Sequence, residues 1–109
     1  MPEEPGLDKF RAALHMARKS GSLLIGFRAV RQALHRKQCK LLVFAEDAGE
    51  SLLRMETGEV PVLRTVDRRT LGAWMGRKEI SVLGLTDPNL AQAVSRAGEG
   101  LKAGRKREA

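Results

Sequence analysis

Cysteine is nearly absent from this chain, which has a single one, Cys39, among its 109 residues. One thiol cannot form an internal disulfide, and the two histidines, His15 and His35, are too far apart along the chain to give the ligand spacing of a zinc site. We therefore expect neither a disulfide nor a bound metal. Cys39 directly precedes an apolar run, which indicates a small, half-buried residue at the start of a strand.

Long hydrophobic runs are also missing. No apolar stretch approaches the roughly 20 residues that a membrane-spanning helix needs. The segment Met1-Pro2-Glu3-Glu4 is acidic, and no apolar signal core follows it. The sequence thus predicts a cytoplasmic protein without a membrane partner.

The sequence motifs of catalysis are absent as well. There is no phosphate-cradling glycine loop, no His-Glu metal motif and no nucleophile signature. Glu46 and Asp47 lie at the end of a predicted strand, but adjacent strand residues point to opposite faces and make a poor acid and base couple. We expect no enzyme activity and no cofactor.

Acidic residues are missing from one long segment, residues 9–45, although the whole chain has 13 of them and a net charge of +7. That segment ends at Ala45, and its basic residues are Lys9, Arg11, Arg18, Lys19, Arg28, Arg31, Arg36, Lys37 and Lys40. A surface that serves only solubility mixes charges of both signs. Such a one-sided distribution is typical of a face that binds a polyanion, and RNA is the partner we expect.

Strand and helix patterns alternate along the chain, which has the length of one domain. Helical spacing is present over 8–19, from 27, over 50–56, after the capping residue Asp67 and over 88–97, and apolar runs predict strands over 22–25, 40–45, 60–63 and 79–86. This order predicts an α/β protein, an α/β/α sandwich around a small, mostly parallel sheet in which the short strand that begins at Ser22 could pair antiparallel. We expect residues 1–6 to be a flexible N-terminus, 7–97 the single domain, and 98–109 a flexible basic tail.

The few aromatic residues are Phe10, Phe27, Phe44 and Trp74, and all four fit apolar faces of the predicted elements. A protein that binds single strands by stacking needs exposed rings. The pattern therefore disfavours a single-strand binder and favours recognition of folded RNA.

The second predicted helix offers a binding face. Arg28, Arg31 and Gln32 share one side of it, and Gly26 leaves the backbone N–H groups at the helix start uncovered by a side chain. Arginine makes bidentate contacts to phosphate, and glutamine both donates to and accepts from a base. The polar loop 76–79 is the natural second element.

Six elements in order resemble the kink-turn-binding ribosomal protein family (L-seven-Ae and L-thirty-e), and its small bacterial YlxQ-like members most of all. The elements that carry the resemblance are Ala17-Arg18-Lys19-Ser20-Gly21-Ser22-Leu23, Gly26-Phe27-Arg28-Ala29-Val30, Lys40 to Ala48, Val60-Pro61-Val62, Leu71-Gly72 and Val82 to Asp87. The resemblance implies a three-layer α/β/α sandwich with a small four-stranded mixed sheet. It also implies binding of sharply bent RNA through the start of the second helix and the loop before the last strand. It implies neither catalysis nor a metal.

The resemblance also assigns positions. The family's glycine falls on Gly26, whereas its asparagine, glutamate and lysine fall on Arg28, Ala29 and Gln32. The candidate RNA-binding residues are Lys19, Gly26, Phe27, Arg28, Arg31, Gln32, Arg77, Lys78, Glu79 and Ile80. We expect a non-catalytic protein that binds structured RNA, such as rRNA, in translation or ribosome biogenesis, together with other ribosome or ribonucleoprotein components. Two alternatives stay open: a protein-interaction scaffold that kept the fold, and a recognition domain detached from an RNA-modifying enzyme.

Overall fold

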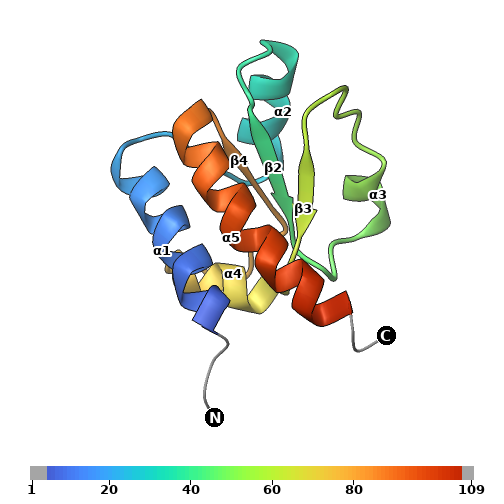
Figure 1. Cartoon of the computed structure of the whole chain (residues 1–109). Helices are drawn as coiled ribbons and strands as arrows, with labels where there is room; N and C mark the ends of the chain where they lie inside the picture. The colour runs from blue at the N-terminus through green and yellow to red at the C-terminus, as the bar shows by residue number, and fades with distance from the viewer. Residues whose placement is uncertain (1–4, 107–109) are drawn as a thin grey trace.

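Four short strands and five helices make up the fold in this computed structural model, which describes residues 5–106, apart from the side chains of residues 5, 53, 100 and 102–106 (Figure 1). In chain order the elements are α1 (Pro5–Lys19), β1 (Leu23–Ile25), α2 (Phe27–His35), β2 (Leu41–Phe44), α3 (Glu50–Leu53), β3 (Val62–Arg64), α4 (Arg68–Trp74), β4 (Val82–Leu85) and α5 (Pro88–Lys106).

The sheet has the strand order β1-β4-β2-β3. Strand β4 pairs antiparallel with both β1 and β2, and β2 pairs parallel with β3, so the sheet is mixed. The central strands β2 and β4 are buried along their whole length, which explains why their sequences are continuous apolar runs rather than alternating ones.

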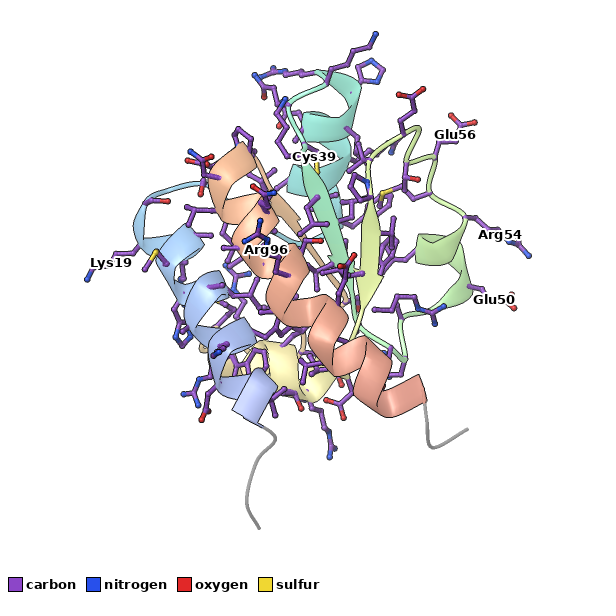
Figure 2. The ribbon with its side chains drawn as sticks, viewed as in Figure 1. Lys19, Cys39, Glu50, Arg54, Glu56 and Arg96 are labelled. Carbon is purple, nitrogen blue, oxygen red and sulfur yellow. The ribbon has the colours of Figure 1, made fainter. Side chains whose placement is uncertain are left out.

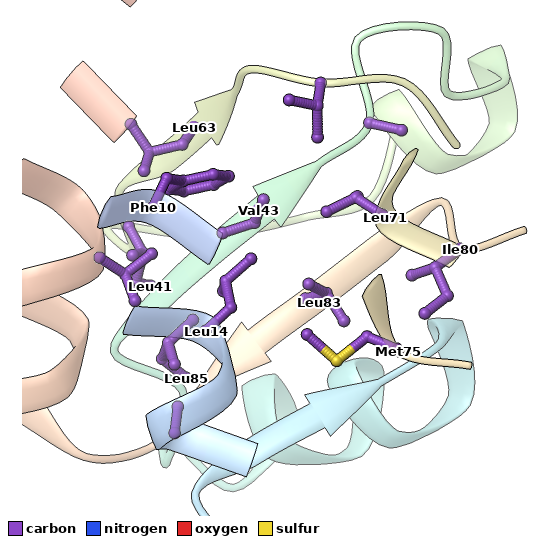
Figure 3. Close-up of a cluster of buried hydrophobic side chains, with 14 of the residues drawn as sticks. Phe10, Leu14, Leu41, Val43, Leu63, Leu71, Met75, Ile80, Leu83 and Leu85 are labelled. Carbon is purple, nitrogen blue, oxygen red and sulfur yellow. The ribbon is translucent and has the colours of Figure 1, made fainter. Parts of the chain in front are cut away.

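Helices α1 and α5 cover one face of the sheet, and α4 closes one end of that layer (Figure 1). The apolar side chains between them form the larger core, in which Phe10 and Leu14 of α1 meet Leu41, Leu83 and Leu85 of the sheet (Figure 3). The ring of Phe10 also makes an edge-to-face contact with Trp74, with 6.0 Å between the ring centroids.

Helices α2 and α3 cover the other face, over a smaller core that includes Val30, Cys39 and Phe44. Gly84 of β4 lets α2 come close, because a Cβ there would lie 3.2 Å from Cγ2 of Val30 and 3.3 Å from Sγ of Cys39. Burial raises the pKa of the Cys39 thiol, an effect that hydrogen bonds to the backbone of Leu41 and Leu85 and the charge of Lys40 oppose. With helices on both faces, the predicted α/β/α sandwich is confirmed.

The last helix is longer than the sequence pattern indicated. The pattern predicted a helix over 88–97, whereas α5 continues to Lys106. The reason is Leu101, which is only 2% exposed and packs into the larger core. Gly98 permits this packing, because a Cβ there would lie 2.7 Å from Cδ1 of Leu63. The expected tail residues 107–109 lie outside the described residues.

The first helix begins at Pro5, three residues before the start that the sequence pattern predicted, and residues 1–4 of the expected N-terminal segment lie outside the described part of the chain. Across 5–106, none of the helices has both the length and the apolar character that crossing a bilayer requires. In the same range, no three His, Cys, Asp or Glu side chains gather in an arrangement that could hold a metal ion.

Candidate functional site

Gly26 forms the turn between β1 and α2. Its φ of 96° and ψ of 162° lie in a region that only glycine adopts without strain. The Gly26 N–H donates to the Val82 carbonyl at 3.0 Å, and no side chain caps α2. A Cβ on Gly26 would meet nothing within 4 Å, so open space lies beside the first-turn amides of α2. These amides carry the partial positive charge of the helix dipole, and no acidic residue is present in the first turn to neutralise it.

A cavity of about 500 Å³ opens beside this helix start. Because the Gly26 N–H donates a hydrogen bond to the Val82 carbonyl, the loop that leads into β4 lies next to the start of α2. The cavity therefore takes its walls from three segments that are distant in sequence, and it is lined by Ile25, Gly26, Phe27, Ser51, Leu52, Arg77, Glu79, Ile80, Ser81 and Val82. Five of the predicted site residues meet here: Gly26, Phe27, Arg77, Glu79 and Ile80.

The loop 76–81 crosses directly over α4. Gly76 ends α4 with a φ of 73°, and the Arg77 N–H donates back to the Gly72 carbonyl at 2.8 Å. A Cβ on Gly72 would lie 2.7 Å from the carbonyl oxygen of Lys78, so only glycine allows this crossing. The absence of a side chain at residue 72 thus fixes how closely the backbone of Arg77 and Lys78 packs against α4.

Arg68, the first residue of α4, also fixes the position of the loop 76–81. Its guanidinium lies 3.5 Å from Oδ2 of Asp47 and 3.7 Å from Oε1 of Glu79. Its N–H donates to Oδ1 of Asp47, and its carbonyl accepts from the Ile80 N–H at 3.1 Å. Arg68 therefore ties the loop after β2 to the loop before β4, and the Glu79 carboxylate faces a protein cation.

The outer face of α2 continues from the cavity. A shallow hollow of about 360 Å³ is lined by Arg28, Arg31, Gln32, His35 and Arg36, all of them exposed. Three predicted site residues, Arg28, Arg31 and Gln32, are thus on one surface.

Phe27 differs from the expectation that all four aromatic residues lie in the core. Phe10 and Phe44 are buried and Trp74 is half-buried, but Phe27 is 43% exposed. It occupies the first position of α2, after the sharp turn at Gly26, and the four-residue α3 leaves its ring uncovered. The Arg31 guanidinium lies 5.9 Å from the ring centroid, a cation–π contact at the rim of the cavity.

Lys19 lies away from this group. It ends α1 just before Ser22, whose carbonyl accepts from the Thr86 N–H at one end of the sheet, whereas Gly26 is bonded to Val82 at the other end. Figure 2 shows Lys19 at the turn that follows α1. Lys78 belongs to the same loop as Arg77 but lines neither the cavity nor the hollow, so eight of the ten predicted site residues line one or the other.

Two residues of α1, Arg18 and His15, contact the end of α4. Arg18 donates to the Met75 carbonyl at 3.0 Å, and Nε2 of His15 lies 2.9 Å from the Trp74 carbonyl oxygen. Both contacts satisfy carbonyls at the end of α4, where a positive charge is favourable. Arg18 thus anchors the end of α4.

Residues that sequence reasoning missed include Arg68, Gly72 and Ser81. Gly72 had a usable signal, since a glycine inside a helical pattern indicates a close backbone approach. Arg68 had none, because its partners Asp47 and Glu79 are far from it in the sequence.

A small α/β/α sandwich with an open, uncapped helix start beside a basic loop defines the class of this protein. The chain belongs to the ribosomal protein L7Ae/L30e/S12e/Gadd45 family, which it matches over residues 8–95. No curated protein sequence matches the chain.

Two solved structures are similar in fold. A protein of unknown function from Bacillus halodurans is 25% identical, with a TM-score of 0.73, and the match covers 84% of this chain and 97% of that one. The Giardia lamblia 15.5kD RNA binding protein is 15% identical, with a TM-score of 0.67, and the match covers 94% of this chain and 92% of that one.

Proposed function

We propose that the protein is a non-catalytic, RNA-binding protein of the ribosomal type, which holds structured RNA at the cavity between the start of α2 and the loop 76–81. The observation that carries this proposal is the meeting of the uncapped α2 start with Arg77 at one cavity, beside a helix face without acids. Family membership supports it, as does the fold shared with an RNA-binding protein of Giardia lamblia.

Each part of the cavity suits one part of an RNA. The free amides after Gly26 fit a phosphate oxygen, and Arg28 adds a bidentate donor beside them. The exposed ring of Phe27 offers a face for stacking an unpaired base, a contact worth about 1–3 kcal/mol. Arg77 and Lys78 reach the RNA from the loop. Glu79 orients that loop through Arg68.

The RNA class we propose is sharply bent RNA of the kink-turn type, bound in the cytoplasm during translation or ribosome biogenesis, together with rRNA or other ribonucleoprotein components. Arg28, Ala29 and Gln32 replace the residues with which the resembled family reads the bend. Because the Ala29 side chain cannot form a hydrogen bond with a base, we expect backbone shape and phosphate contacts to supply most of the affinity.

Titration of a kink-turn RNA and a plain duplex of equal length, at several salt concentrations, tests the proposal. We expect binding that weakens steeply with salt, because phosphate contacts release counterions, and tighter binding to the bent RNA. Arg28→Ala and Arg77→Ala should each weaken binding, whereas Arg96→Ala on α5 removes the same charge from the other layer and should not (Figure 2). Absence of binding to either RNA at low salt would overturn the proposal.

A protein-interaction scaffold is the second candidate. Ala29 favours it, together with the apolar residues Leu52 and Ile80 in the cavity wall. A variant with Arg28→Glu and Arg31→Glu discriminates the two candidates. Loss of RNA binding with unchanged capture of protein partners would favour the scaffold.

A further inference from the structure

The exposed basic residues of α2 continue past the cavity to the far end of the helix. Arg36 lines the same hollow as Arg28 and Arg31, and Lys37 follows it directly. Lys37 and Lys40 line a second cavity of about 690 Å³. This cavity lies at the other end of the sheet, since the Lys40 N–H donates to the Leu85 carbonyl, whereas Gly26 bonds to Val82.

Arg36, Lys37 and Lys40 form no ion pair within residues 5–106, whereas several other basic side chains have a protein partner. Arg54 and Arg68 pair with carboxylates, while Arg18 and Arg64 donate to backbone carbonyls. All four of these lie outside α2. The cations of α2 and of the turn after it are exposed and keep their charge available for a partner, apart from the Arg31 contact with Phe27.

Lys37 is also held in an unfavourable backbone conformation. Its φ is 58°, and it closes α2 in a turn where the Gln38 N–H donates to the Ala33 carbonyl at 2.8 Å. Glycine is the usual residue at this position of such a turn, because a side chain there is strained. A lysine at a position that suits glycine points to a role for its ammonium group.

Acidic residues approach this end of the molecule from one side only. Glu56 and Glu59 line the second cavity opposite Lys37 and Lys40, yet neither forms an ion pair with them in the described structure. Arg36 faces the hollow of α2, which contains no acid. Positive charge therefore dominates the side that continues from the candidate site.

We propose that Arg36, Lys37 and Lys40 form a second phosphate contact, which binds a double-helical stem continuing from the RNA held in the cavity. The proposal rests on the function proposed above and extends it to a second part of the same RNA. At about 1.5 Å per residue, α2 separates residues 27 and 35 by roughly 12 Å, a span of several phosphates along a strand, and Arg36 and Lys37 follow directly after its end.

The test uses two kink-turn RNAs that differ only in one stem, short in the first and longer by a full helical turn in the second. We expect the wild-type protein to bind the longer RNA more tightly. Lys37→Gly and Arg36→Ala should remove most of that advantage and reduce the salt slope for the longer RNA by about one each, with no effect on the shorter RNA. Arg96→Ala serves as the matched control and should change neither.

Lys37→Gly has a second readout that does not depend on RNA. Because glycine relieves the strain at residue 37, the melting temperature should rise while affinity for the longer RNA falls. If both variants keep wild-type affinity and salt slope for the longer RNA, the second contact is overturned and the candidate site remains. If the wild-type protein binds neither RNA, the proposed function fails and this inference falls with it.

Discussion

Gly72 and Lys78 lie in direct backbone contact, since a Cβ on residue 72 would be 2.7 Å from the Lys78 carbonyl oxygen. A Gly72→Ala variant must therefore lift the loop 76–81 or shift α4. We expect a loss of about 1–3 kcal/mol in the free energy of unfolding, the usual cost of overpacking, together with weaker RNA binding.

Urea unfolding measures the first effect of Gly72→Ala and RNA titration the second. Gly49→Ala is the matched control, because Gly49 has a φ of −68° and an added Cβ there meets nothing within 4 Å. Equal stability of the two variants would contradict the close crossing.

Arg68 should position the loop without touching RNA. Arg68→Met removes both ion pairs, and because these side chains are partly exposed we expect a stability loss of only about 0.5–1 kcal/mol. RNA affinity should fall while the salt slope stays the same, since no phosphate contact is lost. Arg77→Ala should lower the slope by about one. A lower slope in Arg68→Met would instead identify Arg68 as a phosphate contact.

Leu101 should contribute as much to the free energy of unfolding as a core residue of the predicted domain, although the sequence around it predicted a tail. It is almost fully buried, so Leu101→Ala should reduce the free energy of unfolding by about 2–5 kcal/mol. Leu101→Met conserves volume and should cost less than about 1.5 kcal/mol. Denaturant titration of both variants measures these losses. An unfolding midpoint for Leu101→Ala equal to that of the wild type would place residue 101 outside the core.

Cys39 should make stability fall at alkaline pH. Burial raises the pKa of its thiol in the folded state, so as pH rises above the ordinary value of about 8.5 the unfolded chain loses this proton first. The unfolded state then binds fewer protons than the folded state, and unfolding becomes more favourable. The difference in unfolding free energy between the wild type and Cys39→Ala should shrink from pH 8 to pH 10, and a constant difference would contradict the raised pKa.

Much of this structure could be predicted from the sequence, because the buried strands are continuous apolar runs and the helix starts carry their own signals. Asp67 accepts from the Thr70 N–H and Asp87 from the Asn89 N–H, as residues before a helix should. Gly26 could be placed at a helix start because the helical spacing begins directly after it.

Features that depend on distant partners were not predictable. The local pattern around Arg68 indicates an ordinary surface residue, and only the fold brings Asp47 and Glu79 next to it. The pattern around Phe27 indicates a core residue, but in the structure its ring is exposed beside the short helix α3. Likewise, α5 extends past Ala97 because Leu101 packs into the larger core, and the local sequence pattern does not indicate this packing.

The packing of Leu101 has a practical use in protein engineering. Its Cδ2 would lie 3.3 Å from a Cβ on Gly6, so the first turn of α1 and the late turns of α5 are neighbours. A short glycine-rich linker should therefore join residue 106 to residue 5, and the exposed turn at Gly58 offers a place to open the chain instead. Such a circular permutant would place its new ends at Gly58, a residue outside the cavity beside Gly26, and would give fluorescent labels a fixed attachment point away from that cavity.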